Sequence, residues 1–239
     1  RVMREVRPDV LVNAAAYTAV DRAESEAEVA SRVNGAAPGI LAEEARGRGT
    51  LMIHYSTDYV FDGEKDAPYT EKDPPNPLST YGRSKLAGEI AIQASSCRHV
   101  ILRTSWVYSS RGGNFLRTIL RLARERRELR VVDDQFGAPT SAIAIARATA
   151  AILRNPRSEG LLHMSAGGST SWHGFAQAIL EHESPSTRLL PIPSKDYPSA
   201  ARRPRNSVLD NSRLQQRFGI VLDDWRTQLR EVLAQLRQG

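Results

Sequence analysis

The feature that most constrains the fold of this 239-residue chain is a regular alternation between short apolar runs and longer amphipathic stretches. The apolar runs predict strands at 10–13, 51–55, 100–103, 129–132 and 161–164. The amphipathic stretches predict helices at 21–32, 36–46, from Thr80 onward, 114–127, 143–153 and 172–181, the last with Ser171 as its N-cap. Repeated strand–helix–strand units predict an α/β protein in which helices cover both faces of a parallel sheet.

The composition is that of a globular protein, with 41% hydrophobic and 25% charged residues. Cys97 is the single cysteine, so the chain forms no internal disulfide, which is typical of the cytoplasm and leads us to expect a cytoplasmic protein. No apolar run approaches the ~20 residues of a membrane-spanning helix, so we expect no membrane partner.

The net charge of +6 raises the question of a nucleic-acid partner. Arg117, Arg121 and Arg124 recur at helical spacing, which is typical of a solvated helix face. Aromatic residues for base stacking are scarce among them, so we expect no nucleic acid, and an anionic small ligand such as a nucleotide diphosphate is the better alternative. The five histidines lack the spacing of metal ligands, and no metal site is predicted.

The most informative local pattern is a Tyr-x-x-x-Lys formed by Tyr81 and Lys85 at the start of a predicted helix. Residues four apart share one helix face, so the phenol and the ammonium can point into one cleft. A nearby positive charge lowers the pKa of a phenol from its usual value of about 10, which would suit it to donate a proton to a carbonyl oxygen. Thr57 lies at the end of the preceding strand, where a second hydrogen-bond donor to that oxygen is expected.

With these patterns in view, the chain resembles the dTDP-4-dehydrorhamnose reductases of the extended short-chain dehydrogenase/reductase superfamily. The segments that carry the resemblance run nearly the whole length of the chain: NAAAYTAVD at 13–21, STDYVF at 56–61, YGRSKLAGE at 81–89, RTSWVY at 103–108, DQFGAPT at 134–140, SAGG at 165–168 and RPRNSVLD at 203–210. It implies a doubly wound, Rossmann-like parallel sheet. It also implies an oxidoreductase that uses NADPH or NADH to reduce the 4-keto group of dTDP-6-deoxy-L-lyxo-4-hexulose, giving dTDP-L-rhamnose for cell-surface polysaccharide.

The resemblance also implies roles for individual residues. Tyr81 is expected to be the general acid, Lys85 to tune it and hold the nicotinamide ribose, and Thr57 to bond the reacting oxygen. The turn Ala14, Ala15, Ala16 and Tyr17 is expected to underlie the cofactor, because small side chains let a ligand approach the backbone.

Four further residues have two interpretations each. Asp58 and Trp106 match positions that line the sugar site, although Asp58 could instead cap a turn and Trp106 belong to the core. Arg203 is expected to bind the nucleotide diphosphate, with a solvated loop as the alternative. Asn34 matches an asparagine that supports the active site of related enzymes, and a role in breaking a helix is equally compatible with its position.

At its N-terminus this sequence departs from the family pattern, since no glycine precedes Gly35 and no Gly-x-Gly-x-x-Gly occurs. We therefore expect an N-terminally truncated dinucleotide-binding domain at 1–153, whose first strand–helix units and pyrophosphate contacts are missing. Residues 154–239 are expected to form mainly a smaller C-terminal sugar-nucleotide lobe, with some segments returning to the first domain. The last helix carries Trp225, Leu229 and Leu233 at core spacing.

Two other functions remain open at this level. A sugar-nucleotide epimerase or dehydratase shares the Tyr-x-x-x-Lys pattern, and a reductase-like chain can also serve as a non-catalytic binding or regulatory subunit. The expected partners are a dTDP-sugar substrate and, in a homodimer, a second copy of the chain.

Overall fold

The computed structural model describes residues 2–154, 159–183 and 187–238. Its helices are α1 (Val2–Val6), α2 (Val20–Ala23), α3 (Ala27–Ser31), α4 (Ala37–Arg46), α5 (Thr80–Ala94), α6 (Phe115–Glu125), α7 (Ala142–Leu153), α8 (Trp172–Glu183), α9 (Ser212–Phe218) and α10 (Trp225–Gln238). Its strands are β1 (Val10–Asn13), β2 (Leu51–Thr57), β3 (His99–Thr104), β4 (Val107–Tyr108), β5 (Glu128–Val132), β6 (Phe136–Gly137), β7 (Thr140–Ser141), β8 (Gly160–His163), β9 (Thr170–Ser171) and β10 (Arg188–Ile192). The predicted alternation of strands and helices is confirmed, and the predicted helix at 21–32 holds two short helices, α2 and α3.

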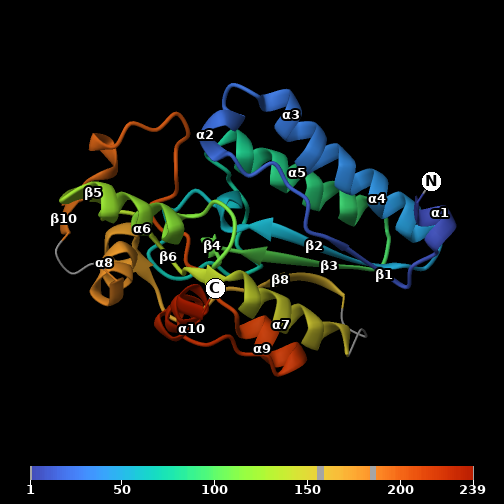
Figure 1. Cartoon of the computed structure of the whole chain (residues 1–239). Coiled ribbons are helices and arrows are strands. Elements are labelled where there is room, and N and C mark those ends of the chain that lie inside the picture. The colour runs from blue at the N-terminus through green and yellow to red at the C-terminus, as the bar shows by residue number, and fades with distance from the viewer. Residues whose placement is uncertain (1, 155–158, 184–186, 239) are drawn as a thin grey trace.

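Four parallel strands form the central sheet in the order β1-β2-β3-β8. This confirms the α/β class with a parallel sheet (Figure 1). The predicted strand at 129–132 also exists, as β5, but it does not join the central sheet. It pairs instead with β10 in a separate two-stranded parallel sheet.

Helices cover both faces of the central sheet (Figure 1). Side chains alternate along each strand, so Met52 and Ile101 point to the face covered by α4 and α5, whereas Ile53 and Leu102 point to the face covered by α7 and α9. All four of these side chains are fully buried. The strands therefore read as continuous apolar runs, as expected for a parallel sheet between two helical layers.

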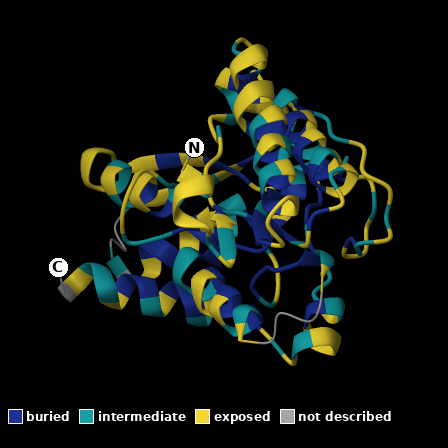
Figure 2. Ribbon diagram, turned by 90° about the vertical axis from the view of Figure 1, so that its right-hand side faces the viewer, coloured by how far each residue is buried: buried dark blue, intermediate teal, exposed yellow. Residues whose placement is uncertain are grey.

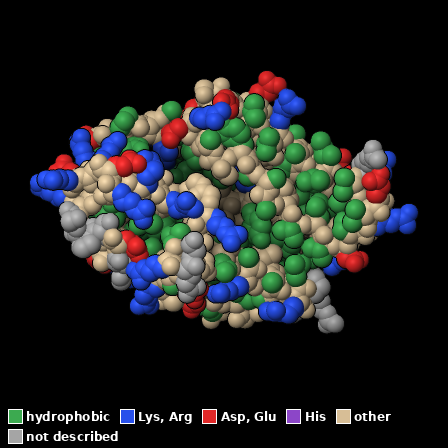
Figure 3. Space-filling model, in the orientation of Figure 1, with side chains coloured by type: hydrophobic (Ala, Val, Ile, Leu, Met, Phe, Trp, Pro, Cys, Tyr) green, Lys and Arg blue, Asp and Glu red, His purple; other side chains and the backbone are tan. Residues whose placement is uncertain are grey.

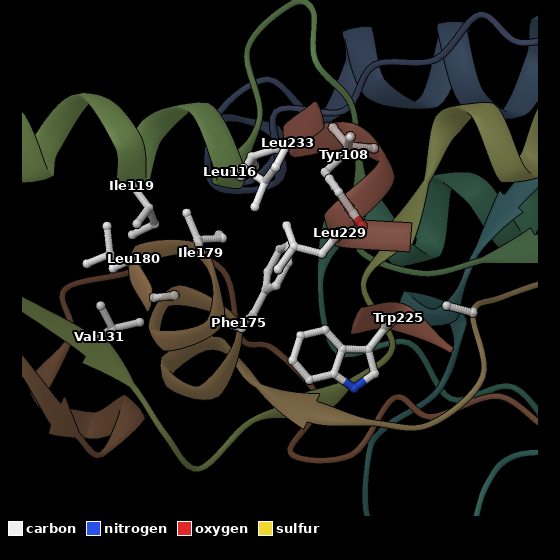
Figure 4. Packing of buried hydrophobic residues seen from close by; sticks show 14 of the residues in the cluster. Tyr108, Leu116, Ile119, Val131, Phe175, Ile179, Leu180, Trp225, Leu229 and Leu233 are labelled. Atoms are coloured by element: carbon white, nitrogen blue, oxygen red, sulfur yellow. The ribbon is translucent and has the colours of Figure 1, made fainter. Parts of the chain in front are cut away.

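A second core lies beside the sheet, where α6, α8, α10 and β5 meet. Figure 4 shows Phe175 of α8 between Trp225 and Leu229 of α10 on one side and Leu116 of α6 on the other. The apolar face of α6 points into this core, while Arg117, Arg121 and Arg124 are exposed on the opposite face. This confirms the prediction of a solvated arginine face, and the exposed outer sides of the helices are visible in Figure 2.

The two cores draw on interleaved parts of the chain. Residues of α6 and β5 pack with the second core, although they precede α7 and β8, which belong to the central sheet layers. Within the described ranges, no helix is both long and apolar enough to cross a membrane.

Candidate active site

The start of α5 is fixed firmly beside the end of β2. The Ser79 hydroxyl accepts a hydrogen bond from Gly82 N at 3.1 Å, so Ser79 is the N-cap of α5. The Glu24 carboxylate of the loop after α2 accepts from both the backbone N–H and the hydroxyl of Thr80, each at 2.8 Å. A Cβ at Gly82 would lie 2.2 Å from the Tyr59 carbonyl oxygen, so only glycine allows α5 to come this close to the turn after β2.

Tyr81 lies in the first turn of α5 and is half-buried. Its ring packs edge-on against that of Tyr59, with centroids 5.9 Å apart. Burial raises the pKa of Tyr81 to about 12, a hydrogen bond with the Thr57 hydroxyl acts to lower it, and the negative charge of Asp58 acts to raise it. The Tyr-x-x-x-Lys spacing predicted a lowered pKa, and the direction of that prediction is wrong for this structure because desolvation dominates.

Lys85 lies one turn further along α5 and is 2% exposed. Its Nζ donates a hydrogen bond to the backbone oxygen of Tyr55 at 2.6 Å and lies 3.2 Å from Nε2 of His54, both in β2. The ammonium is therefore directed to the sheet rather than bonded to the phenol of Tyr81. Burial lowers the pKa of Lys85 to about 8, while the negative charge of Glu89 acts to raise it.

Thr57 and Asp58 follow one another at the carboxyl end of β2. The Thr57 hydroxyl donates to Asp58 Oδ1 at 3.0 Å and accepts from Tyr59 N at 3.1 Å, which caps the short 3-10 turn Asp58–Val60. Asp58 is 2% exposed, and burial raises its pKa to about 7 although hydrogen bonds act to lower it. Thr57 therefore terminates the strand, and its hydroxyl acts to lower the pKa of the Tyr81 phenol, which burial raises.

The turn after β1 lies at the same edge of the sheet. Ala14, Ala15 and Ala16 are exposed, so their backbone is open to a ligand. The end of the turn is clamped by Asn34, which accepts from Tyr17 N at 2.8 Å and donates to Tyr17 O at 2.9 Å.

Asn34 itself is fully buried within a π-helical segment, Arg32–Ala36, that joins α3 to α4. Its amide also donates to the Ser84 hydroxyl of α5 at 3.0 Å. A Cβ at Gly88 would lie 2.2 Å from the Asn34 carbonyl oxygen, so α5 packs directly on the widened turn. Asn34 therefore occupies an irregular helical turn and at the same time ties the Ala14–Tyr17 turn to the helix that carries Tyr81 and Lys85.

Trp106 follows β3 and has a positive φ of 47°. Its ring stacks on that of Trp172 at the start of α8, with centroids 3.5 Å apart and planes 2° from parallel. Phe115 packs against the other tryptophan at 4.7 Å. Trp106 and Trp172 are both half-buried, and Trp172 also packs against the second core, so the pair lies at the edge of that core. Sequence reasoning missed Trp172, which was interpreted only as the first residue of a helix.

Arg203 lies in the segment that precedes α9. Its Nη2 pairs with Asp21 Oδ2 of α2 at 2.7 Å. Burial acts to lower the pKa of the guanidinium, but its interactions with Asp21 and with Tyr59 raise it. Burial acts to raise the pKa of Asp21, but hydrogen bonds from Arg203, Ala201 and Ser199 lower it to about 2. Arg203 thus ties the C-terminal part of the chain to α2 and to the tyrosine that packs on Tyr81.

These groups are brought together from distant parts of the chain. The ends of β1 and β2, the first two turns of α5 and the segment around Arg203 converge at one edge of the central sheet. Figure 3 shows a hollow near the centre of the corresponding view, with Lys and Arg side chains gathered over the half of the molecule that holds α6 and α8. Among the residues that the structure describes, no group of three or more His, Cys, Asp or Glu side chains is placed to hold a metal ion.

The comparisons with known proteins agree with this arrangement. The family described as "RmlD substrate binding domain" matches residues 1–238. A dTDP-4-dehydrorhamnose reductase of Burkholderia thailandensis is 51% identical over 242 residues, which cover 95% of this chain and 81% of that protein.

Two solved structures superpose closely. The dTDP-4-dehydrorhamnose reductase of Clostridium acetobutylicum is 36% identical with a TM-score of 0.95, covering 98% of this chain and 83% of that one. The enzyme from Bacillus anthracis, solved in complex with NADP, is 33% identical with the same TM-score and the same coverage.

A parallel α/β sheet with Tyr, Lys and Thr side chains at the carboxyl edge of its strands defines the class of short-chain dehydrogenase/reductase. Within that class, the family of the chain is identified by the length over which the family model matches and by the sequence identity to curated relatives. The chain belongs to the RmlD substrate binding domain family, to which the resemblance in its sequence pointed.

Proposed function

We propose that the chain is an oxidoreductase that uses NADPH or NADH to reduce the 4-keto group of dTDP-6-deoxy-L-lyxo-4-hexulose to dTDP-L-rhamnose. The observation that carries this proposal is the placement of Tyr81 and Lys85 one turn apart at the start of α5, where Lys85 reaches the backbone of β2 and Thr57 ends that strand. The chain is also 51% identical to a named dTDP-4-dehydrorhamnose reductase. A nicotinamide dinucleotide held by these residues would supply the hydride. The protein must then supply a proton, hold the sugar and hold the nicotinamide.

Tyr81 is the proposed general acid. With a pKa near 12 the phenol is protonated at neutral pH, so its proton is present when the ketone oxygen begins to gain negative charge. Hydride addition to the carbonyl carbon and transfer of the phenolic proton to the oxygen together convert the ketone into an alcohol. Thr57 would donate a hydrogen bond to the same ketone oxygen once its hydroxyl turns away from Asp58 Oδ1, to which it donates in this structure.

Lys85 has two proposed roles. Its ammonium would bond the nicotinamide ribose together with Tyr81, and its positive charge would stabilise the phenolate that remains after proton transfer. The exposed turn of Ala14, Ala15 and Ala16, with Tyr17 at its end, would lie along the cofactor, and the absence of large side chains there fits that role.

The sugar nucleotide would be held by groups from both parts of the molecule. Asp58 and the stacked Trp106 would line the sugar, and Arg203 would approach the diphosphate from the segment before α9. We accordingly propose a dinucleotide-binding domain built mainly from 1–153 and a sugar-nucleotide lobe built mainly from 154–239. In this division α6 and β5 pack in the second core, while β8 and α9 return to the central sheet. A homodimer and a cytoplasmic location belong to the same proposal.

The test is consumption of NADPH by the purified chain in the presence of the 4-keto sugar nucleotide, compared among three proteins. Tyr81→Phe should lower kcat by about 10²- to 10⁴-fold, the usual value of a general acid. Tyr55→Phe is the matched control, because its hydroxyl contacts Thr149 on the other face of the sheet and only its backbone oxygen meets Lys85.

Each competing function gives a different result. An epimerase or dehydratase would convert the sugar without net consumption of NADPH. A non-catalytic subunit would bind the sugar nucleotide and consume no NADPH. Full turnover by Tyr81→Phe would contradict the proposed role of the phenol.

A further inference from the structure

Three buried polar side chains form a continuous chain, of which the proposed chemistry uses only Lys85. Asn13 ends β1, His54 lies beside it in the register of the β1–β2 pair, and Lys85 reaches the same histidine from α5. The Asn13 amide nitrogen lies 3.0 Å from His54 Nδ1, and Lys85 Nζ lies 3.2 Å from His54 Nε2. These three residues are 6%, 0% and 2% exposed, so each hydrogen bond among them must be matched in donor and acceptor.

The donors and acceptors of these groups allow two arrangements of hydrogen bonds. An ammonium has only donors, so a charged Lys85 must donate to Nε2 of a neutral His54. A neutral imidazole has one N–H, so its Nδ1 then carries the proton and must donate to the oxygen of the Asn13 amide. With the oxygen turned toward the histidine, the backbone N–H of Ala15 loses the acceptor that it otherwise finds in Asn13 Oδ1 at 3.3 Å.

The second arrangement applies to an uncharged Lys85. His54 Nε2–H donates to the lone pair of Nζ, the Asn13 amide N–H donates to Nδ1, and Ala15 N–H donates to Asn13 Oδ1. Lys85 still donates to the Tyr55 carbonyl in both arrangements. The two differ by a single proton, held by Lys85, and by the direction of the two hydrogen bonds that join Lys85 to His54 and His54 to Asn13.

We propose that Asn13 and His54 are positioning residues that couple the charge of Lys85 to the backbone N–H of Ala15. Charging Lys85 frees that N–H on the turn assigned to the cofactor, and a ligand oxygen that accepts from Ala15 favours the charged lysine in return, because coupling between two sites is reciprocal. This inference rests on the proposed role of the Ala14–Tyr17 turn and of Lys85. The ligand class is a dinucleotide that places an acceptor oxygen against Ala15.

The surroundings of Lys85 allow this change of charge near neutral pH. The titratable or charged groups that act on it are His54 of β2, which contacts Nζ, and Glu89 of its own helix, which is itself paired with Arg103 of β3. Burial lowers the pKa of Lys85 to about 8 and that of His54 to about 3, so the lysine titrates in a range where the histidine stays neutral.

The direct test is the tautomer of His54, read by ¹⁵N NMR in the cofactor-free, histidine-labelled chain between pH 6 and pH 10. We expect an Nε2–H tautomer at pH 10 and an Nδ1–H tautomer at pH 6, with a midpoint near pH 8. His163 is a control in the same spectrum, because its Nδ1 faces the Tyr69 carbonyl at 3.0 Å and must carry the proton at every pH. One unchanged tautomer for His54, or an imidazolium at pH 6, would overturn the proposal.

The variant Asn13→Asp tests whether Asn13 sets the tautomer of His54. In Asn13→Asp the side chain is an acceptor only, so His54 should stay in the Nδ1–H tautomer across the whole range, with Lys85 charged. A tautomer change that persists in Asn13→Asp would show that Asn13 does not direct the chain.

Calorimetry separates this inference from the proposed function. When NADP⁺ is titrated at pH 9 in two buffers of different ionisation enthalpy, we expect uptake of up to one proton per cofactor, and less than half as much in Asn13→Asp. Binding without proton uptake would overturn the coupling while leaving the reductase proposal intact. If NADP⁺ does not bind, the cofactor role fails, whereas the tautomer measurement still decides whether the chain of bonds exists.

Discussion

Replacing Glu89 by Gln removes one charge from the buried ion pair that joins α5 to the central sheet. Arg103 Nε and Nη2 donate to the two oxygens of the Glu89 carboxylate at 2.9 and 2.6 Å, and the Ser56 hydroxyl also donates to it. The side chains of Glu89 and Arg103 are only 2% and 3% exposed. Gln keeps the shape of Glu and one acceptor oxygen, but it leaves the guanidinium buried without a counter-charge.

The magnitude follows from that burial. Removing one partner of a buried pair typically costs about 3–5 kcal/mol, because the remaining charge has lost its solvent and its partner. The surface pair Arg121–Glu125 gives the matched comparison, since its side chains are 61% and 49% exposed and such pairs contribute about 0–1 kcal/mol. Glu125→Gln should therefore leave the free energy of unfolding nearly unchanged.

The assay is urea unfolding followed by tryptophan fluorescence and circular dichroism. A cost of 3 kcal/mol with a slope of about 2–3 kcal/mol per M lowers the midpoint by about 1 M or more. The double variant Glu89→Leu with Arg103→Met should recover most of the loss, because apolar residues of similar volume leave no buried charge. A loss below about 1 kcal/mol in Glu89→Gln, or no recovery in the double variant, would refute the reasoning.

Three further predictions follow from single sites. Gly82→Ala should cost about 1–3 kcal/mol in urea unfolding, because its Cβ would meet the Tyr59 carbonyl at 2.2 Å, whereas Gly113→Ala, with nothing within 4 Å, should cost less than 1 kcal/mol. Asp58→Asn should stabilise the chain at pH 8 but not at pH 3. The raised pKa of Asp58 means that folding opposes its ionisation, a cost absent below the unfolded pKa of 3.8 and complete above about 7, at most about 4 kcal/mol. Unfolding curves at the two pH values check this, and equal effects would contradict it. Trp172→Ala should raise KM for the dTDP-sugar about tenfold with a smaller change in kcat, because Trp106 loses the ring on which it stacks, and steady-state kinetics that show an unchanged KM would count against a sugar site there.

Much of the fold was predictable from local patterns. Strands β2 and β3 are long apolar runs bounded by turn residues, and α5 and α8 begin at serines whose hydroxyls accept from the first turn. Each of these patterns is contained in a few adjacent residues, so it can be recognised without knowledge of the rest of the chain. The family resemblance added the expectation of a doubly wound, Rossmann-like sheet.

Pairing between distant segments was not predictable in this way. The apolar run at 129–132 looks like the other strand signals, yet β5 pairs with β10 because α6, α8 and α10 build a second core around it. Arg203 was assigned to a ligand from its basic neighbourhood, but the partner that the structure gives it, Asp21, lies 182 residues away in sequence. Neither the β5–β10 pairing nor the Arg203–Asp21 ion pair is predicted by the sequence next to these residues.

The direction of the pKa shift at Tyr81 also depends on contacts that local sequence does not reveal. Spacing places Tyr81 and Lys85 on one face of α5, but a shift in pKa depends on which atoms the ammonium meets and how much water the phenol keeps. Lys85 meets Tyr55 and His54 because β2 passes beside α5, and Gly82 lets the start of that helix approach the turn at Tyr59 that follows β2. His54 therefore lies next to Lys85 only because β2 packs against α5. Its partner Asn13 enters through the register of β1 against β2, so the charge of the lysine depends on a strand pairing that no motif around Tyr81 records.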